Sequence, residues 1–283
     1  MTTQIDELMT FLSGSITPFH AVEVMAKTLQ RAGFEQLDQF DAVRMTPGKG
    51  YFVVHQGSSL MAVRAGHSGV EAGLRLVGAH TDSPNLSVKP NPVKGRDGCI
   101  QLGVDVYGGA LLNPWFDRDL GMAGRLSMLT PDNALRTTLF DTGRAVAVIP
   151  SLAIHLDREA NTQRSINRQK DVVPLVMLGE HEQYDLKAWL AQELARVDSQ
   201  WQGARVMDYE LSLYDTQPPN QIGIDGDFIA SARLDNLLSC FAGMRALIDA
   251  DDAEWSLFVA TDHEEVGSAS TVGAQGPMLM DAL

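Results

Sequence analysis

Apolar positions in the N-terminal third of the chain follow first a helical and then a strand-like spacing. Across residues 18–33, apolar side chains recur every three or four positions and the segment ends in Gly, which predicts an amphipathic helix with a C-terminal cap. Short Val-rich runs bounded by Gly, Ser or His follow at 51–54, 60–65 and 74–79. Such runs are typical of buried strands, and we expect the three to be adjacent in one sheet.

A second pair of elements near the other end completes this pattern. Residues 234–248 have helical spacing, and residues 255–260 form another short apolar run typical of a buried strand. Strands that alternate with helices indicate an α/β fold.

The middle of the chain has a different texture and is bounded by Pro pairs, Pro90 with Pro92 and Pro218 with Pro219. Such pairs commonly punctuate structure. Inside these boundaries one helix, 184–197, and several strands are predicted; the strands are 101–106, 123–129, 137–141 and 145–149. We therefore divide the chain into a first domain formed by 1–91 and 223–283, interrupted by a β-rich insertion, 92–222.

Composition excludes several classes of protein. With 45% apolar and 20% charged residues in 283, the chain resembles an ordinary globular protein. A net charge of −14 and the lack of a basic stripe argue against nucleic acid and anionic membranes as partners. No apolar stretch approaches the ~20 residues of a membrane span, and Asp6 and Glu7 stand where a secretory signal would be positive. We expect a cytoplasmic protein whose two cysteines, Cys99 and Cys240, are free buried thiols.

Candidate chemistry begins where the third predicted strand ends, at His80 and Asp82. The carboxyl edge of an open α/β sheet is where ligands bind. A metal-bound His usually donates its second ring N–H to a carboxylate, and Asp82 is placed to accept it. The HxD pattern alone is weak, however, and a polar surface or satisfied core His is the more common case.

Two further segments carry carboxylates in comparable positions. Glu264 and Glu265 follow the strand at 255–260, and as neighbours in sequence they can point in different directions, one to a metal and one to its water. An EE pair alone is more often a solvated loop. Asp235 stands at the start of the 234–248 helix, where the common role is to stabilise the helix N-terminus and the alternative is to bridge two metal ions.

Together these segments offer imidazole nitrogen and carboxylate oxygen without sulfur. Zinc, manganese or cobalt held by imidazole and carboxylate fits this donor set better than a structural zinc site does. Two metals that share a carboxylate and a water are a common solution for amide hydrolysis, but they need roughly five protein ligands. Only His80, Asp235 and Glu265 are nominated here.

Six ordered motifs give the chain a specific resemblance over almost its whole length. It resembles the aspartyl aminopeptidase family, bacterial branch, whose members are dinuclear zinc exopeptidases that assemble as tetrahedral dodecamers. The motifs are ITPFHAV (16–22), GAHTDSP (78–84), NPWFDRDL (113–120), IPSLAIHLDR (149–158), SARLDN (231–236) and DHEEVGS (262–268).

The resemblance implies a role for each matching position. His80 would bind the first of two divalent ions, Asp235 would bridge both, and Glu265 would bind the second. Glu264 would be the general base that activates the shared water, and Asp82 would hold His80 in place. The fold that the resemblance implies is a mixed-sheet zinc-exopeptidase α/β domain with an inserted β-rich dimerisation domain.

The fourth motif implies a residue that acts between subunits. In relatives, a His at the position of His155 reaches the site of a neighbouring subunit and helps to stabilise the tetrahedral intermediate. From its sequence context alone, His155 would be an ordinary polar residue of a strand or loop.

Relatives also continue well beyond Leu283, and the continuation carries a further metal-binding Asp and a C-terminal metal-binding His. We therefore expect a truncated form that is inactive or nearly so.

The expected activity is a cytoplasmic metallo-aminopeptidase that removes N-terminal Asp or Glu from peptides with a free N-terminus and works as a homo-oligomer. Two alternatives stay open: a dinuclear aminopeptidase of broader specificity, and, for this short form, a non-catalytic oligomerisation module.

Overall fold

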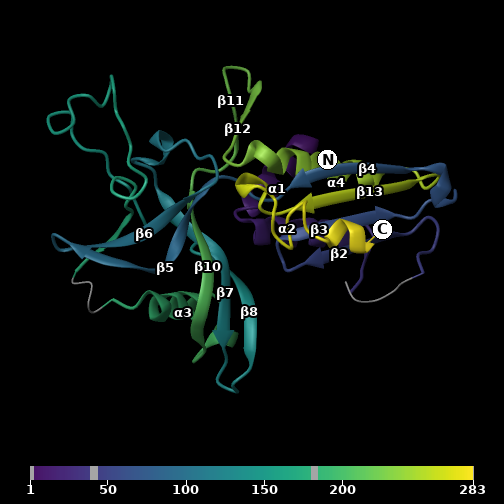
Figure 1. The fold of residues 1–283 in the computed structure, drawn as a ribbon, viewed down its shortest axis with the longest axis horizontal. Coiled ribbons are helices and arrows are strands. Elements are labelled where there is room, and N and C mark those ends of the chain that lie inside the picture. Colours follow the sequence, from purple (N-terminus) through teal and green to yellow (C-terminus); the bar gives the residue numbers. More distant parts are fainter. Residues whose placement is uncertain (1–2, 39–43, 180–183, 283) are drawn as a thin grey trace. The chain divides into compact units, whose positions relative to one another are not determined.

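The computed structural model describes residues 3–38, 44–179 and 184–282, and these form two units (Figure 1). The first unit contains Met1–Ser83 and Pro218–Leu283, and the second contains Pro84–Gln217. The second unit is thus inserted into the first along the chain. Pro90 and Pro92, which suggest a boundary in the sequence, lie inside a strand of the second unit.

The first unit is built on a five-stranded mixed sheet in the order β1-β2-β3-β13-β4. The β2–β3 and β3–β13 pairs are antiparallel, whereas β1–β2 and β13–β4 are parallel. The predicted mixed α/β class is therefore confirmed. The strands span Glu35–Gln36 (β1), Gly50–His55 (β2), Ser59–Arg64 (β3), Leu74–His80 (β4) and Trp255–Thr261 (β13).

The order of these strands corrects one expectation. The run at 74–79 does form β4, but β13 separates it from β3, so the three N-terminal strands are not all adjacent. The reason lies in the side chains of β13, which are apolar on both faces. Phe258 and Ala260 face one core cluster, and Leu257 and Val259 face another. A strand with apolar side chains on both faces is shielded from water most fully in the interior of a sheet.

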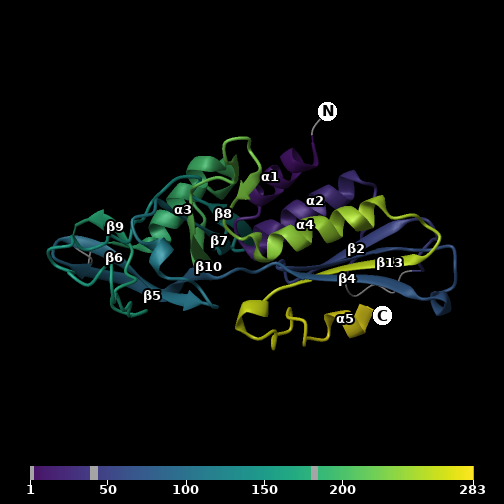
Figure 2. The same ribbon diagram turned by 90° about the horizontal axis from the view of Figure 1, so that it is seen from above.

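Helices cover one face of this sheet and the C-terminal segment covers the other, as Figure 2 shows. The helical face packs on Met25, Leu29 and Met244, among others. On the opposite face, Met278 packs against Met61. The helices of the unit are α1 (Gln4–Gly14), α2 (Pro18–Arg31), α4 (Leu234–Asp249) and α5 (Met278–Ala282), and a small hairpin joins β11 (Asn220–Ile222) to β12 (Phe228–Ala230).

Helix α1 was not predicted from the apolar spacing, although its start carries a recognisable signal. Thr3 and Asp6 form a capping box, in which the Asp6 N–H donates to Thr3 Oγ1 at 3.1 Å and the Thr3 N–H donates to Asp6 Oδ2 at 2.9 Å. These bonds satisfy N–H groups that have no partner within the helix. The acidic side chain at position 6 therefore has a local structural role.

The second unit is a six-stranded antiparallel sheet in the order β8-β7-β10-β5-β6-β9, with α3 packed on it. Leu186, Leu190 and Leu194 form the buried stripe of α3, and Asp185 caps the helix by accepting from the Ala188 N–H at 3.1 Å. The elements are β5 (Asn85–Arg96), β6 (Cys99–Tyr107), β7 (Leu120–Leu129), β8 (Leu135–Asp141), β9 (Leu175–Leu178), α3 (Leu186–Val197) and β10 (Arg205–Asp215).

Several details of this unit depart from the predicted strands. Strands β5, β9 and β10 lie outside every predicted strand. The run at 145–149 forms only isolated bridges, Leu120 with Ala147 and Val148 with Leu175, and the Pro at position 150 has no N–H with which to extend a ladder. Conversely, β5 passes through its two prolines, because its pairing with β6 is irregular between Val88 and Val93. An irregular stretch of this kind tolerates residues that cannot donate.

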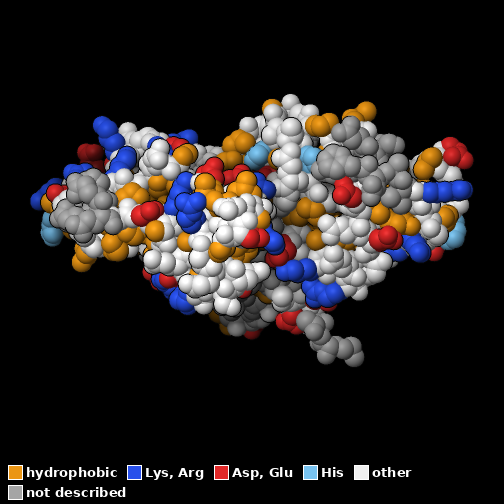
Figure 3. All heavy atoms as spheres, turned by 90° about the horizontal axis from the view of Figure 1, so that it is seen from below, with side chains coloured by type: hydrophobic (Ala, Val, Ile, Leu, Met, Phe, Trp, Pro, Cys, Tyr) orange, Lys and Arg blue, Asp and Glu red, His pale blue; other side chains and the backbone are white. Residues whose placement is uncertain are grey.

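The charges on the face drawn in Figure 3 are mixed, and Cys99 and Cys240 are free thiols. On the face shown in Figure 3, Lys and Arg side chains lie among Asp and Glu and form no continuous stripe. Among the described helices, none has both the length and the apolar character needed to cross a membrane. Both cysteines are free as predicted, but only Cys240 is fully buried; Cys99 is half-buried.

Close packing of α4 on β13 leads to a stability prediction. A Cβ at Gly243 would lie 2.7 Å from the Phe258 ring and 3.1 Å from Val77. We expect Gly243→Ala to lower the free energy of unfolding by roughly 1–3 kcal/mol, the usual cost of overpacking a core. Gly78→Ala is the matched control, because a Cβ there meets no atom within 4 Å. Urea unfolding midpoints measure both, and equal midpoints for the two variants would contradict the packing.

Candidate metal-binding site

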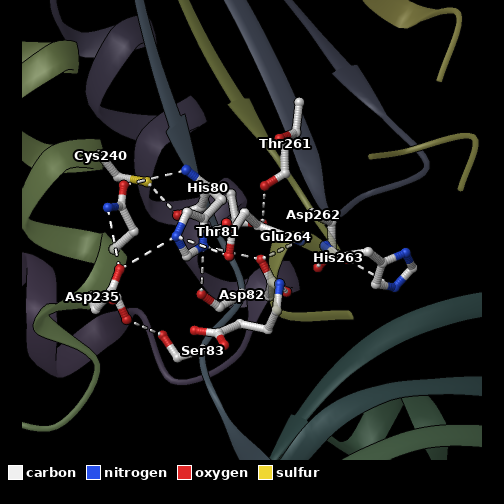
Figure 4. A network of polar contacts seen from close by, with 12 residues as sticks. His80, Thr81, Asp82, Ser83, Asp235, Cys240, Thr261, Asp262, His263 and Glu264 are labelled. Carbon is white, nitrogen blue, oxygen red and sulfur yellow. Dashed lines mark hydrogen bonds and ion pairs between the residues drawn. The ribbon is translucent and has the colours of Figure 1, made fainter. Parts of the chain in front are cut away.

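The candidate site forms where two parallel strands end at the same edge of the sheet. In the β4–β13 register, His80 is opposite Thr261. The pairing continues one residue further, since the Thr81 N–H donates to the Thr261 carbonyl at 2.8 Å. Residues 180 positions apart in sequence, Thr81 and Thr261, are thereby joined, and the segments that follow both strands enter one polar network (Figure 4).

His80 lies at the centre of this network, with 13% of its side chain exposed. Its Nδ1 is 3.2 Å from Asp82 Oδ1 and 3.1 Å from the Asp82 carbonyl oxygen. Both neighbours are acceptors, so Nδ1 carries a proton. Its Nε2 faces two more carboxylates, Asp235 Oδ1 at 3.3 Å and Glu264 Oε2 at 3.7 Å. Four acceptor oxygens therefore surround one imidazole.

Asp235 does not occupy the N-cap position that a helix-capping role requires. It interrupts the helical backbone of α4, and Arg233, not Asp235, occupies the N-cap position. Its side chain is 78% exposed and points toward His80 (Figure 4). Asn236 supports it by donating from Nδ2 to Asp235 Oδ1 at 3.3 Å, and the Ser83 hydroxyl donates to its carbonyl oxygen at 2.7 Å. The orientation of Asp235 thus serves the network and not the helix.

Glu264 and Glu265 open a short 3₁₀ turn, Glu264–Val266, directly after β13. The turn is bracketed by positive φ angles at His263, 64°, and Gly267, 100°. The Asp82 carboxylate accepts hydrogen bonds from the backbone N–H groups of both residues, from Glu264 at 3.2 Å and from Glu265 at 3.1 Å. The backbone of the EE pair is therefore held at the end of β4.

The electrostatics of the site favour a cation. Burial, followed by the negative charges of Asp82, Asp235 and Glu264, raises the pKa of Glu265, although His80 opposes this. Cys240, whose Sγ donates to the His80 carbonyl at 3.1 Å, is not a competing thiolate ligand. Burial, with the charge of Asp82, raises the pKa of the Cys240 thiol to about 12. Excess negative charge here is carried by carboxylates alone.

The donor set fits a metal ion of the predicted kind. Two ligands of a tetrahedral zinc ion, each about 2.0–2.1 Å from it, stand about 3.3 Å apart. The Nε2 of His80 and Oδ1 of Asp235 are separated by that distance. Within the described ranges, however, no three His, Cys, Asp or Glu side chains converge closely enough to hold an ion by themselves. The residues present match part of a metal centre.

Five of the six predicted site residues belong to the first unit, and the sixth, His155, does not. His80, Asp82, Asp235, Glu264 and Glu265 lie in or directly beside the network of Figure 4. His155 belongs to the second unit, where it is exposed in the segment that follows Ile149. Its predicted role toward another subunit stays a prediction.

Several residues of the network were not singled out in the sequence. Asn236 Oδ1 accepts the His80 N–H at 3.3 Å while its Nδ2 reaches Asp235, and Thr81 Oγ1 donates to the Ser58 carbonyl at 2.8 Å. Asn236 directly follows a nominated ligand inside the SARLDN motif, which is the one signal that could have found it.

Comparisons with known proteins agree with the motif resemblance. The family described as Aminopeptidase I zinc metalloprotease (M18) matches residues 11–283. A "Probable M18 family aminopeptidase 2" of Ectopseudomonas mendocina is 50% identical over 281 residues, which are 99% of this chain and 65% of the relative. The chain thus spans about 65% of the length of that curated relative.

Solved structures show the same fold. The structure of Chaetomium thermophilum mApe1 is 30% identical with a TM-score of 0.85, over 97% of this chain and 65% of that one. The S. cerevisiae mApe1 dodecamer is 27% identical with a TM-score of 0.80, over 98% and 64% of the two chains. Together with the family match, they confirm the predicted family and its α/β architecture.

The surroundings of His80 predict how the metal-free protein responds to pH. Burial lowers the pKa of His80, but the hydrogen bond and charge of Asp82 and the charge of Glu264 outweigh it and raise the pKa above the ordinary value of 6.5. A raised pKa stabilises the fold below pH 6.5, and this contribution is lost as the pH rises through the folded-state value. We expect urea unfolding with EDTA to show wild type losing more stability than His80→Gln between pH 6 and 8. Parallel losses would contradict the assigned contacts.

Proposed function

We propose that this chain, which belongs to the M18 family of aminopeptidase I zinc metalloproteases, provides the metal-binding edge of a metal-dependent aminopeptidase. The observation that carries the proposal is the arrangement of His80 at the end of β4, with Nδ1 toward Asp82 and Nε2 toward Asp235. A proton on Nδ1 leaves the Nε2 lone pair directed at a carboxylate. Only a cation, either a second proton or a metal ion, makes that contact favourable.

The proposed centre holds two divalent ions, with zinc as the first choice and manganese or cobalt as alternatives. His80 would hold the first ion, Asp235 would bridge both, and Glu265 would hold the second. When bound, such ions polarise a carbonyl oxygen and make water more acidic. The absence of sulfur from the donor set and the raised pKa of Glu265 among other carboxylates both support divalent cations at this edge.

Glu264 is the proposed general base. Its side chain is 55% exposed and reaches toward His80 Nε2, while its backbone N–H is held by Asp82. A carboxylate so placed accepts a proton from the attacking water and returns it to the leaving amine. Asp82 keeps the His80 proton on Nδ1, so that Nε2 stays available to the cation. His155 of a second copy donates to the developing oxyanion.

The substrate class is peptides with a free N-terminus, with Asp or Glu preferred at that position. A net charge of −14 does not attract acidic peptides at long range. Selectivity must therefore arise from cations close to the site, and a broader-specificity aminopeptidase is the competing proposal.

Self-association is part of the same proposal. One structural neighbour is described as a dodecamer. We assign this chain to a homo-oligomer in which the β-rich second unit, Pro84–Gln217, supplies the dimer contact and carries the exposed His155.

Metal binding tests the ligand assignment. In titrations of the metal-free chain with Zn²⁺ or Co²⁺, His80→Ala and Asp235→Ala should each weaken binding at least about 10-fold, because a direct ligand is lost. Glu264→Gln removes a nearby charge but no proposed ligand, so it should weaken binding less than either of these variants. His67→Ala is the matched control, since His67 is an exposed His beside a carboxylate, 3.5 Å from Asp252. Equal affinities for His67→Ala and His80→Ala would refute the assignment.

Hydrolysis tests the activity. The described residues supply three of the roughly five ligands of a dinuclear centre, so the 283-residue chain should cleave aminoacyl p-nitroanilides slowly or not at all. The full-length Ectopseudomonas mendocina relative, assayed in parallel, should be active and prefer Asp or Glu over Leu and Lys. Robust turnover by the short chain would refute the ligand count, and a preference for Leu would refute acidic specificity. A folded chain without metal binding or turnover would favour the oligomerisation module.

A further inference from the structure

The buried carboxylate of Asp82 contacts both parts of the candidate site, the end of β4 and the segment that follows β13. The side chain of Asp82 is 1% exposed, and it lies just beyond β4, where the segment following β13 also passes (Figure 4). Asp82 Oδ1 accepts from His80 Nδ1 at 3.2 Å and from the Glu264 N–H at 3.2 Å. Asp82 Oδ2 accepts from the Glu265 N–H at 3.1 Å. Each oxygen is thus engaged by the turn that carries the EE pair.

The 3₁₀ turn Glu264–Val266 needs an acceptor for the N–H groups of its first two residues. A 3₁₀ segment of three residues has N–H groups at its start that find no partner within the turn. The N–H of Val266 donates to the His263 carbonyl, but those of Glu264 and Glu265 donate to Asp82. Hydrogen bonds to an ionised acceptor are about twice as strong as neutral ones. The carboxylate therefore contributes more to the turn than a carbonyl oxygen would.

Packing does not replace this contact for the first Glu. The Glu264 side chain is more than half exposed, and the Gly267 that ends the turn meets no neighbour where a Cβ would lie. The position of the Glu264 backbone, and with it the reach of its carboxylate toward His80, rests on polar contacts of the main chain.

We propose that Asp82 is a positioning residue for Glu264 and Glu265 as well as for His80. The role deepens the proposed function, since it sets the separation between the His80 imidazole and the Glu264 carboxylate through one side chain. Loss of Asp82 would displace the turn even where the imidazole keeps its orientation.

Amide hydrogen exchange of the metal-free chain, followed by NMR, separates this role from a role through His80 alone. In Asp82→Asn, one acceptor oxygen becomes an NH₂ donor and the charge is lost. The Glu264 and Glu265 amides should then exchange about 10- to 100-fold faster, as expected for a lost charge-assisted bond. His80→Ala keeps the carboxylate and should leave both amides within about threefold of wild type.

The β13 amides, Val259 for example, are the internal reference for global stability. Unchanged exchange of both Glu amides in Asp82→Asn, or equal acceleration in His80→Ala, would overturn the proposal. If Asp82→Asn does not fold, the wild type decides: through-hydrogen-bond scalar couplings between Asp82 ¹³Cγ and the Glu264 and Glu265 ¹⁵N nuclei support the role, and their absence at both overturns it. Neither measurement involves metal or turnover, so failure of the proposed activity is recognised separately.

Discussion

The parallel pairing of β4 with β13 is the constraint on which the candidate site depends. It brings the ends of two strands, separated by most of the chain, to one edge in a fixed register, His80 opposite Thr261. Each strand then leaves the sheet with its own polar segment, and the Thr81–Thr261 hydrogen bond keeps the two segments together for one residue more. A slip of one residue in this pairing would turn the side chain of His80 to the other face of the sheet.

The energy that holds this register comes from apolar packing. Phe258 and Ala260 face the helices, whereas Leu257 and Val259 face the side covered by Met278. Burial on both faces is the reason β13 lies inside the sheet and β4 at its edge. A polar site at the strand ends can be rich in carboxylates because the stability of the sheet does not rely on it.

Much of the fold could be predicted from apolar spacing, and the failures have physical causes. Period and punctuation identified α2, α4, β2, β3, β4 and β13 within two residues but missed the short β1, β11 and β12, and they carry no information about strand order. The order depends on which strand is buried on both faces. The run at 145–149 satisfied the local pattern of a strand yet has too few partners, and β5 accommodates Pro90 and Pro92 because its pairing is irregular there. Which segments pair with one another is decided by the tertiary structure and not by the local sequence.

The residues that meet at the site could be nominated from their chemical type and their places in the chain, His80 and Glu265 after strands and Asp235 at the start of a helix, together with the motif resemblance. The supporting contacts were not. Asn236 joins the His80 backbone to the Asp235 carboxylate, and Ser83 binds the Asp235 carbonyl, through bonds that no spacing reveals. Asp82 was expected to hold an imidazole, which it does, but its bonds to two backbone N–H groups become visible only in three dimensions.

These contacts show how the site accommodates a buried anion. The ionised form of a buried carboxylate is costly unless several donors surround it, and Asp82 has an imidazole N–H and two amide N–H groups. The carboxylates of Asp235 and Glu264 differ from that of Asp82, because both are largely exposed and therefore solvated. The fold thus satisfies the buried anion with donors of the chain itself. The two exposed anions are left to solvent and converge on one atom, His80 Nε2.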